Sequence, residues 1–328
     1  MITFNDLKVK LKADFRPLIN WFRKNKLSKE VYTNDKVKGT AETIFIVDGR
    51  LNHGGLSDRF NGIISTYAIC KVYNLPFRIK WEYPFILQDY LVPNKYDWVI
   101  KKDERFVLNK TSNIVIVLND PKSKALFSIS NKRQNHIYAN INILPLIQKK
   151  YGIQYEWHTL FQELFKPNEI LEEKLAEQLN HIGKSYIGIV FRFQQLLGDF
   201  KEGNYKILSP VERNKLLDKC IKSVLDIKKK YSQKHILVTS DSVTFLNRIK
   251  KEENVFIIPG RVVHISFSTN ENYNSYLKSF LDFYMLSKAE KVFSVIAPEM
   301  TIDGHLFLTT FPEYAAKAGN IDFERIFL

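Results

Sequence analysis

The chain has 328 residues, of which 45% are hydrophobic and 13% aromatic, and its formal net charge is +14. This composition is typical of a folded globular protein large enough for two domains, and it excludes a disordered chain. No run of about eighteen apolar residues occurs that could span a membrane, and we expect no signal peptide because the N-terminus lacks an apolar core segment. The two cysteines, Cys70 and Cys220, lie far apart, so we expect no disulfide framework and a cytoplasmic protein.

The excess positive charge is dense in the first 40 residues, which carry ten basic and four acidic side chains. Apolar residues recur there at helical spacing: Leu7, Leu11, Phe15, Leu18 and Phe22. We therefore expect residues 1–40 to form a basic amphipathic arm, in which Pro17 kinks the helix or begins a second one. Such an arm binds an anionic membrane surface through residues 1–30, or it packs on the protein's own body. The sequence carries no nucleic-acid-binding signature, and we expect no nucleic-acid partner.

Strands and helices alternate along the rest of the chain. In residues 41–175 the pattern predicts strands at Thr43–Val47, Phe77–Trp81 and Asn113–Leu118, and helices at Asp58–Asn74 and around Asn140–Tyr151. In residues 176–328 it predicts strands at Ser185–Phe191, His235–Thr239, Val255–Ile258 and Lys291–Val295, and helices at Pro210–Tyr231, Val243–Lys251, Tyr273–Ala289 and Pro312–Ala318. This alternation indicates an α/β protein with two doubly wound parallel sheets. The carboxyl ends of their strands are then expected to face a cleft between the two domains.

The first predicted strand runs into the loop His53-Gly54-Gly55-Leu56-Ser57-Asp58-Arg59, which opens the first predicted helix. A helix that starts in this way points unpaired backbone N–H groups at an anion. Gly54 and Gly55 let a ligand approach the backbone, and Arg59 adds donors suited to phosphate. A plain strand-to-helix turn, capped by Ser57 or Asp58, explains the same residues.

Three further polar residues follow or end predicted strands. Arg192 leaves a buried strand, which is costly unless an anionic ligand or a neighbouring carboxylate pairs with it. Asp241 either caps the next helix or accepts hydrogen bonds from a nucleotide base, and Ser294 either binds phosphate or is structural. Because strand ends of this kind line one crevice, we expect these residues and Arg59 to form one site.

Five segments in chain order resemble motifs of the fucosyltransferase superfamily, which includes bacterial α-1,2- and α-1,6-fucosyltransferases and protein O-fucosyltransferases. They are the 53–59 loop, Val190-Phe191-Arg192-Phe193 with Gly198-Asp199, Val238-Thr239-Ser240-Asp241-Ser242, Asp282-Phe283-Tyr284-Met285-Leu286-Ser287-Lys288-Ala289 with Ser294, and Phe311-Pro312-Glu313-Tyr314-Ala315-Ala316. The resemblance covers residues 43–328 and leaves out the basic arm.

This resemblance implies the GT-B fold, with an N-terminal Rossmann-like domain on the acceptor side and a C-terminal one that binds the nucleotide sugar. It implies GDP-fucose as donor, transferred with inversion. It also implies that Arg192 holds the β-phosphate, that Asp241 meets the guanine and that Ser294 meets a phosphate. The N-terminal loop, with Gly54, Gly55, Asp58 and Arg59, would face donor or acceptor.

Cleavage of a glycosyl–phosphate bond builds negative charge on the departing diphosphate, which fixed cations must stabilise. No Asp-x-Asp triplet for a metal occurs in the chain, so we expect no metal cofactor and assign this task to Arg192, Arg59 and helix N-termini. The acceptor hydroxyl needs a base. The candidates are Asp199, Asp58, Glu202 and His53.

The sequence thus predicts a metal-independent, inverting transferase, with L-fucose as the expected sugar. Its acceptor would be a glycan hydroxyl in the synthesis of surface polysaccharide or lipid-linked glycan, at the inner face of the membrane. Two alternatives remain open. The same fold could use another nucleotide sugar, or the chain could be a non-catalytic module that binds a nucleotide or a glycan.

Overall fold

The computed structural model describes residues 15–34, 40–100, 106, 108–199, 206–266, 272–302 and 305–328. The chain divides into two compact units, Met1–Lys166 (unit 1) and Pro167–Leu328 (unit 2). The sequence placed the boundary after residue 175, which lies inside helix α6 (Glu169–Ile182). The helix begins after Asn168, which caps its first turn by accepting from the backbone N–H of Leu171 at 2.9 Å, and it belongs to unit 2.

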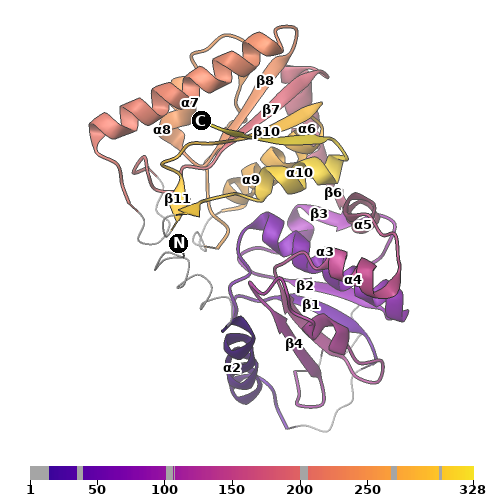
Figure 1. Ribbon diagram of the computed structural model, residues 1–328. Helices are drawn as coiled ribbons and strands as arrows, with labels where there is room; N and C mark the ends of the chain where they lie inside the picture. The colour runs from indigo at the N-terminus through magenta and orange to yellow at the C-terminus, as the bar shows by residue number, and fades with distance from the viewer. Residues whose placement is uncertain are drawn as a thin grey trace. The chain divides into compact units, whose positions relative to one another are not determined.

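In the described residues, unit 1 contains a four-stranded parallel sheet in the order β2-β1-β5-β4 (Figure 1). Its strands are β1 (Thr43–Val47), β2 (Phe77–Trp81), β4 (Asn113–Val117) and β5 (Asn135–Ala139), and β3 (Leu91–Pro93) pairs separately with β6 (Phe165–Pro167). Its helices are α2 (Arg16–Glu30), α3 (Leu56–Tyr73), α4 (Leu144–Tyr151) and α5 (Trp157–Leu164), with 3-10 turns at Leu87–Asp89 and Ala125–Ser128. The β-branched run of β1 is buried throughout, as expected for a central parallel strand.

Strand β5 is absent from the sequence prediction, whereas the helix expected around Asn140–Tyr151 is present as α4, directly after this strand. The strand carries Asn135 and His136, which are unusual in a fully buried strand. Both are satisfied by hydrogen bonds inside unit 1. Asn135 donates to the Thr43 hydroxyl at 3.3 Å, and the His136 ring lies 2.7 Å from the Tyr32 hydroxyl and 2.8 Å from Gln134 Oε1. Tertiary partners therefore override the local polarity of the sequence.

Unit 2 contains a five-stranded parallel sheet in the order β13-β10-β7-β8-β9. Its strands are β7 (Tyr186–Phe191), β8 (His235–Ser240), β9 (Val255–Phe256), β10 (Lys291–Ile296) and β13 (Asp322–Phe327), with a small hairpin of β11 (Thr301–Ile302) and β12 (His305–Leu306). Its helices besides α6 are α7 (Pro210–Lys230), α8 (Val243–Ile249), α9 (Tyr273–Ser287) and α10 (Phe311–Gly319).

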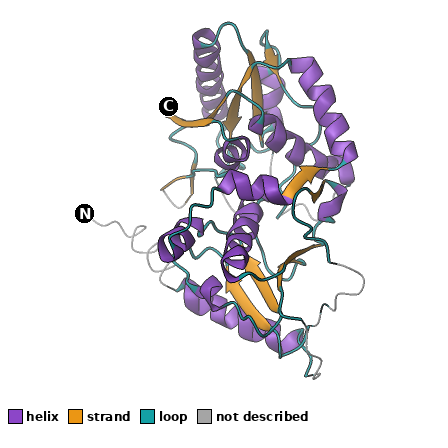
Figure 2. Ribbon diagram, turned by 90° about the vertical axis from the view of Figure 1, so that its right-hand side faces the viewer, coloured by secondary structure: helices purple, strands orange, loops and turns teal. Residues whose placement is uncertain are grey.

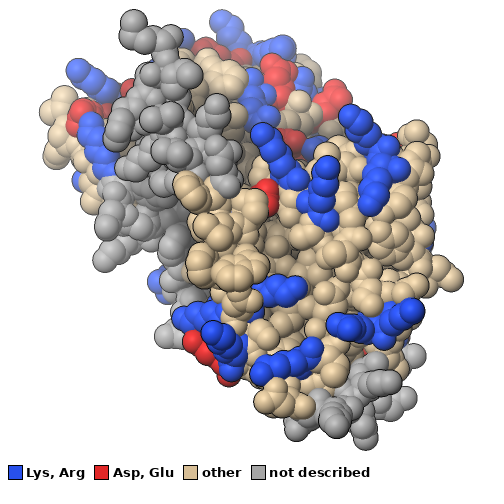
Figure 3. All heavy atoms as spheres, turned by 60° about the horizontal axis from the view of Figure 1, so that its bottom comes forward, with Lys and Arg blue, Asp and Glu red and all other residues tan. Residues whose placement is uncertain are grey.

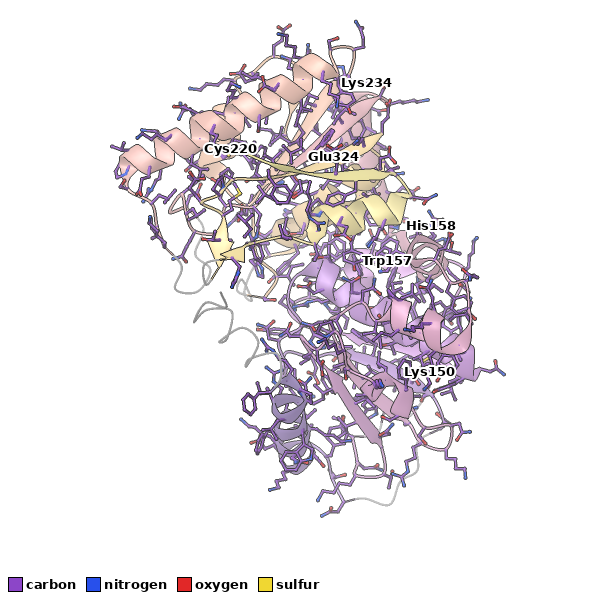
Figure 4. All side chains as sticks on the ribbon, viewed as in Figure 1. Lys150, Trp157, His158, Cys220, Lys234 and Glu324 are labelled. Carbon is purple, nitrogen blue, oxygen red and sulfur yellow. The ribbon has the colours of Figure 1, made fainter. Side chains whose placement is uncertain are left out.

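Helices cover both faces of this sheet (Figure 2). Helices α7 and α8 share one apolar core with β7, β8 and β10, and Cys220 of α7 points into it (Figure 4). Helices α9 and α10 pack against each other, with α10 against β10 and α6 against α9. Both cysteines are buried and free. None of the helices within the described residues is long and apolar enough to cross a membrane.

The strand order of unit 2 has a switch point at β7. From β7 the chain adds β8 and β9 on one side and then crosses to add β10 and β13 on the other. Ligands of doubly wound proteins bind at the carboxyl ends of the strands beside such a point. The switch point therefore directs attention to the loops that follow β7, β8 and β10.

Helix α3 lies very close to strand β5, and a glycine makes this approach possible. A Cβ atom at Gly62 would overlap the backbone carbonyl group of Ala139, which cannot rotate away. We predict that Gly62→Ala lowers the free energy of unfolding by about 1–3 kcal/mol through overpacking. Val72→Ala, at a half-buried position near the end of the same helix, should cost less than about 1 kcal/mol. Urea denaturation measures both, and equal losses would contradict this account of the packing.

Candidate functional site

Two residues predicted for the donor site meet at the carboxyl edge of the unit 2 sheet. Arg192 directly follows β7 and Asp241 directly follows the adjacent strand β8. Arg192 Nη1 donates to Asp241 Oδ2 at 2.6 Å, and the two side chains are 15% and 5% exposed. The sequence analysis considered an anionic ligand or a neighbouring carboxylate as the partner of Arg192. In the structure Arg192 pairs with a carboxylate, that of Asp241.

The Asp241 carboxylate also organises the loop that follows β7. Its Oδ1 accepts from the backbone N–H of Phe193 at 2.8 Å, and its Oδ2 accepts from that of Gln194 at 2.6 Å. Burial raises the pKa of the Asp241 carboxyl, while Arg192 and these N–H groups oppose the rise. Since both carboxylate oxygens already accept hydrogen bonds, Asp241 acts here as a positioning group. Its predicted contact with guanine stays a prediction.

Asp199 lies further along the connection between β7 and α7 and is exposed. Its Oδ2 accepts from the Ser242 hydroxyl at 2.8 Å and from the Thr244 N–H at 2.5 Å. Ser242 in turn caps helix α8 by accepting from the Phe245 N–H at 3.0 Å. The loop is thus tied to the end of β8 at Phe193 and Gln194 and to the start of α8 at Asp199. The role of Asp199 as a base stays a prediction.

The sequence predicted Ser294 at the end of its strand, but the structure places it inside the strand. Strand β10 continues to Ile296, and Ser294 pairs in register with Val190 and Arg325 inside the sheet. The residue is completely buried, and its hydroxyl has no hydrogen-bond partner among the described residues. The hydroxyl is not accessible from solvent in this structure, and its predicted contact with phosphate stays a prediction.

In unit 1 the glycine loop opens helix α3 in the expected way. Gly55 is the N-cap residue, and its N–H donates to the Asp58 carboxylate at 2.9 Å. Gly54 has a φ of +77°, in the left-handed region that favours glycine, and its N–H donates to Asn52 Oδ1 at 2.8 Å. Asp58, one of the predicted catalytic residues, is therefore a capping residue in this structure.

Arg59, predicted to bind phosphate, is only 3% exposed. Its Nε donates to the Gly54 carbonyl at 3.2 Å and its Nη1 to the Tyr83 carbonyl at 2.9 Å. The guanidinium also lies 4.9 Å from the centre of the Trp81 ring, a cation–π contact. These contacts make Arg59 a buried residue that fixes the glycine loop against the end of β2.

The two remaining base candidates receive no support. His53 is 1% exposed, and burial together with the charge of Arg59 lowers its pKa to about 3. Its ring is therefore neutral, and Nδ1 donates to the Leu51 carbonyl at 3.0 Å. An acceptor hydroxyl cannot reach it in this structure. Glu202 lies outside the described residues.

Within the described part of the chain, no three His, Cys, Asp or Glu side chains lie close enough together to hold a metal ion. The structure does contain a buried ion pair that the sequence analysis missed. Lys278 Nζ donates to both carboxylate oxygens of Asp282, at 2.8 and 2.7 Å, within helix α9. Burial raises the pKa of Asp282, and Lys278 opposes the rise. The available signal in the sequence was a Lys and an Asp four residues apart in a predicted helix.

Each unit has a parallel sheet with helices packed against it, which is the Rossmann-like architecture of the GT-B class. In unit 2, polar residues lie at the strand ends beside the switch point. Solved structures of known proteins confirm this fold class, although comparisons based on the sequence found no match. No protein-family model matches the sequence, and a search of curated proteins found no match.

Solved structures do match. A variant of Arabidopsis thaliana FUT1 in complex with GDP aligns over 99% of this chain and 79% of its own, with a TM-score of 0.55 and 11% identity. The α-1,6-fucosyltransferase NodZ, soaked with GDP-fucose, aligns over 85% of this chain and 93% of its own, with a TM-score of 0.50 and 12% identity. At such low identity the likeness shows the fold, which this chain shares with two fucosyltransferases.

The two glycines of the N-terminal loop differ in what a side chain would meet. At Gly54 a Cβ would run into the Asp58 carboxylate in a backbone conformation that L-residues avoid, whereas at Gly55 the nearest atom is 3.8 Å away. We predict that Gly54→Ala lowers the free energy of unfolding by about 1–2 kcal/mol, and that Gly55→Ala has a smaller effect. Urea denaturation of both variants measures the difference, and a larger loss for Gly55→Ala would refute the assignment.

Asp241→Asn tests the carboxylate that holds the β7 loop. The amide group keeps only one acceptor oxygen and carries no charge, so at least one backbone N–H loses its acceptor and Arg192 loses its counter-charge; we therefore predict a loss of about 3 kcal/mol in unfolding free energy. The matched control is Asp218→Asn, which removes the exposed ion pair of Asp218 with Arg248. That variant should lose less than about 1 kcal/mol. Similar losses in chemical denaturation would show that the Asp241 network contributes little.

Proposed function

We propose that this protein is an inverting, metal-independent glycosyltransferase that moves L-fucose from GDP-fucose to a glycan hydroxyl. The observation that carries the proposal is the Arg192–Asp241 pair at the switch point of the unit 2 sheet. The shared fold supports it, since the matching structures include a FUT1 variant in complex with GDP and NodZ soaked with GDP-fucose. The motif resemblance from residue 53 onward supports fucose as the sugar.

Arg192 supplies the charge that the reaction needs. As the bond between sugar and β-phosphate breaks, negative charge grows on the departing diphosphate, and a fixed cation at that place lowers the barrier. Asp241 sets the direction of the guanidinium through the 2.6 Å contact before any donor arrives. We therefore assign Arg192 to the phosphate and Asp241 to the positioning of Arg192.

A base must take the proton of the acceptor hydroxyl as the new glycosidic bond forms. Asp199 is exposed at the end of the β7 loop, and Asp58 is half-buried at the start of α3. We propose that one of these two carboxylates is the base, while the burial of His53 speaks against that residue. The proposal places the enzyme in the cytoplasm, where it would extend a surface polysaccharide or a lipid-linked glycan at the inner face of the membrane.

Purified protein with GDP-fucose and a glycan acceptor, in the presence of EDTA, tests this function through the release of GDP. We predict that Arg192→Ala and Arg192→Lys both lower turnover about a hundredfold or more, because Lys lacks the planar fork of donors. Arg192→Lys keeps a cation beside Asp241 and should remain folded. The matched control is Arg248→Ala on α8, whose arginine pairs with Asp218 and should not affect turnover.

Three outcomes would contradict the proposal. Unchanged turnover in folded Arg192→Lys would show that another group meets the phosphate. Turnover that EDTA abolishes would refute the metal-independent mechanism. Binding of GDP-fucose without any transfer or hydrolysis would favour a binding module over an enzyme.

A further inference from the structure

Helix α2 exposes apolar residues and buries a polar one. Its buried residues are Asn20 and Leu27, and Asn20 Nδ2 donates to the Leu118 carbonyl at 3.3 Å. Apart from Leu27, its large apolar residues are exposed: Phe15 at the N-cap, Leu18, Trp21 and Phe22 are 52%, 46%, 55% and 59% exposed. A surface helix of a soluble protein usually shows the opposite arrangement. This exposed set, Phe15, Leu18, Trp21 and Phe22, is called the α2 apolar face below.

The α2 apolar face is one continuous surface. Phe15, Leu18 and Phe22 follow one another at spacings of three and four residues, which places them on one side of the helix. The Trp21 ring packs edge-on against Phe22 with 4.9 Å between ring centroids. Side chains of α2 project away from the sheet of unit 1, while the opposite side of the helix packs against β4 (Figure 4).

The helix that carries this face is rich in basic residues. Between Arg16 and Glu30 the helix carries five basic residues and one acidic residue. The basic ones are Arg16, Arg23, Lys24, Lys26 and Lys29. Figure 3 shows more Lys and Arg than Asp and Glu side chains on the face in view. The partner of the α2 apolar face should therefore be apolar at its centre and negatively charged around it.

We propose that α2 is an interfacial helix that docks on an anionic lipid membrane. Its apolar face enters the boundary between headgroups and acyl chains, where Trp and Phe are favoured, and its Lys and Arg side chains meet the lipid phosphates. A second copy of the chain fits less well, because the basic residues of two α2 helices would repel each other. The inference does not rest on the proposed transfer reaction, since none of the residues assigned to that reaction lies on α2.

Trp21 provides a direct readout of docking. The other three tryptophans, Trp81, Trp98 and Trp157, are no more than 6% exposed, so Trp21 is the one that a lipid can reach. The full-length protein is mixed with vesicles of phosphatidylserine and phosphatidylcholine that carry brominated acyl chains. We expect quenching of tryptophan fluorescence with these vesicles and little with phosphatidylcholine alone. Trp21→Phe should lose the quenching yet still co-sediment with the vesicles.

Paired variants separate the apolar from the electrostatic contribution. Leu18→Ser with Phe22→Ser should weaken co-sedimentation about tenfold or more. The control, Ile170→Ser with Val211→Ser, changes similarly exposed apolar residues in unit 2 and should have no effect. Lys26→Gln with Lys29→Gln should weaken binding to phosphatidylserine vesicles, whereas Lys229→Gln with Lys230→Gln, on α7, should not.

Several results would overturn the proposal. These are the absence of vesicle binding by the unaltered protein, binding that survives the change of Leu18 and Phe22, and self-association that the same change abolishes. A preference of α2 for nucleic acid over vesicles would overturn it too. GDP release with a soluble acceptor is measured alongside, and we expect it to be unchanged in the α2 variants. Failure of docking is thereby distinguished from failure of the transferase function.

Discussion

One carboxylate fixes the geometry on which the candidate donor site depends. Asp241, at the end of β8, binds the guanidinium of Arg192 and the backbone N–H groups of Phe193 and Gln194. It thereby joins the ends of two adjacent strands and allows Gln194 to hold a φ of +56°. Since Asp199 ties the far end of the loop to α8, the cation is oriented before an anion arrives. Such preorganisation is what stabilises developing charge effectively.

The two arginines predicted to bind phosphate illustrate how a similar sequence context leads to different roles. Arg192 directly follows β7 and Arg59 lies in the first turn of α3, and both are held by oxygen atoms of their own unit. Arg59 is held by the carbonyl groups of Gly54 and Tyr83 and by the Trp81 ring, and it is almost fully buried. The Arg192 side chain keeps 15% of its surface exposed at the switch point. Accessibility, which the sequence does not encode locally, therefore favours Arg192 as the phosphate contact.

The sequence predicted the fold wherever local pattern and tertiary environment agree. The apolar strands Thr43–Val47 and Phe77–Trp81 were predicted with their exact observed bounds. Strand β5 was missed because its polar residues are paired with distant partners such as Tyr32. The same limit applies to the site. A pattern shows that Arg192 follows a strand, but only the structure shows that its partner is Asp241, and that Ser294 lies within β10 instead of at its tip.

The exposure of the α2 apolar face follows from how the helix is anchored. The helical spacing in the sequence predicted a helix here but left open whether its apolar side meets the protein or a membrane. Asn20 of α2 donates to the Leu118 carbonyl, and Tyr32, which follows the helix, contacts the His136 ring, so both residues tie this segment to the rest of unit 1. Burial lowers the pKa of His136 to about 3, so its neutral ring can accept from the Tyr32 hydroxyl at physiological pH. Rotation of α2 to bury Phe22 against unit 1 would break the Asn20 contact, so the polar anchor keeps the apolar face outward.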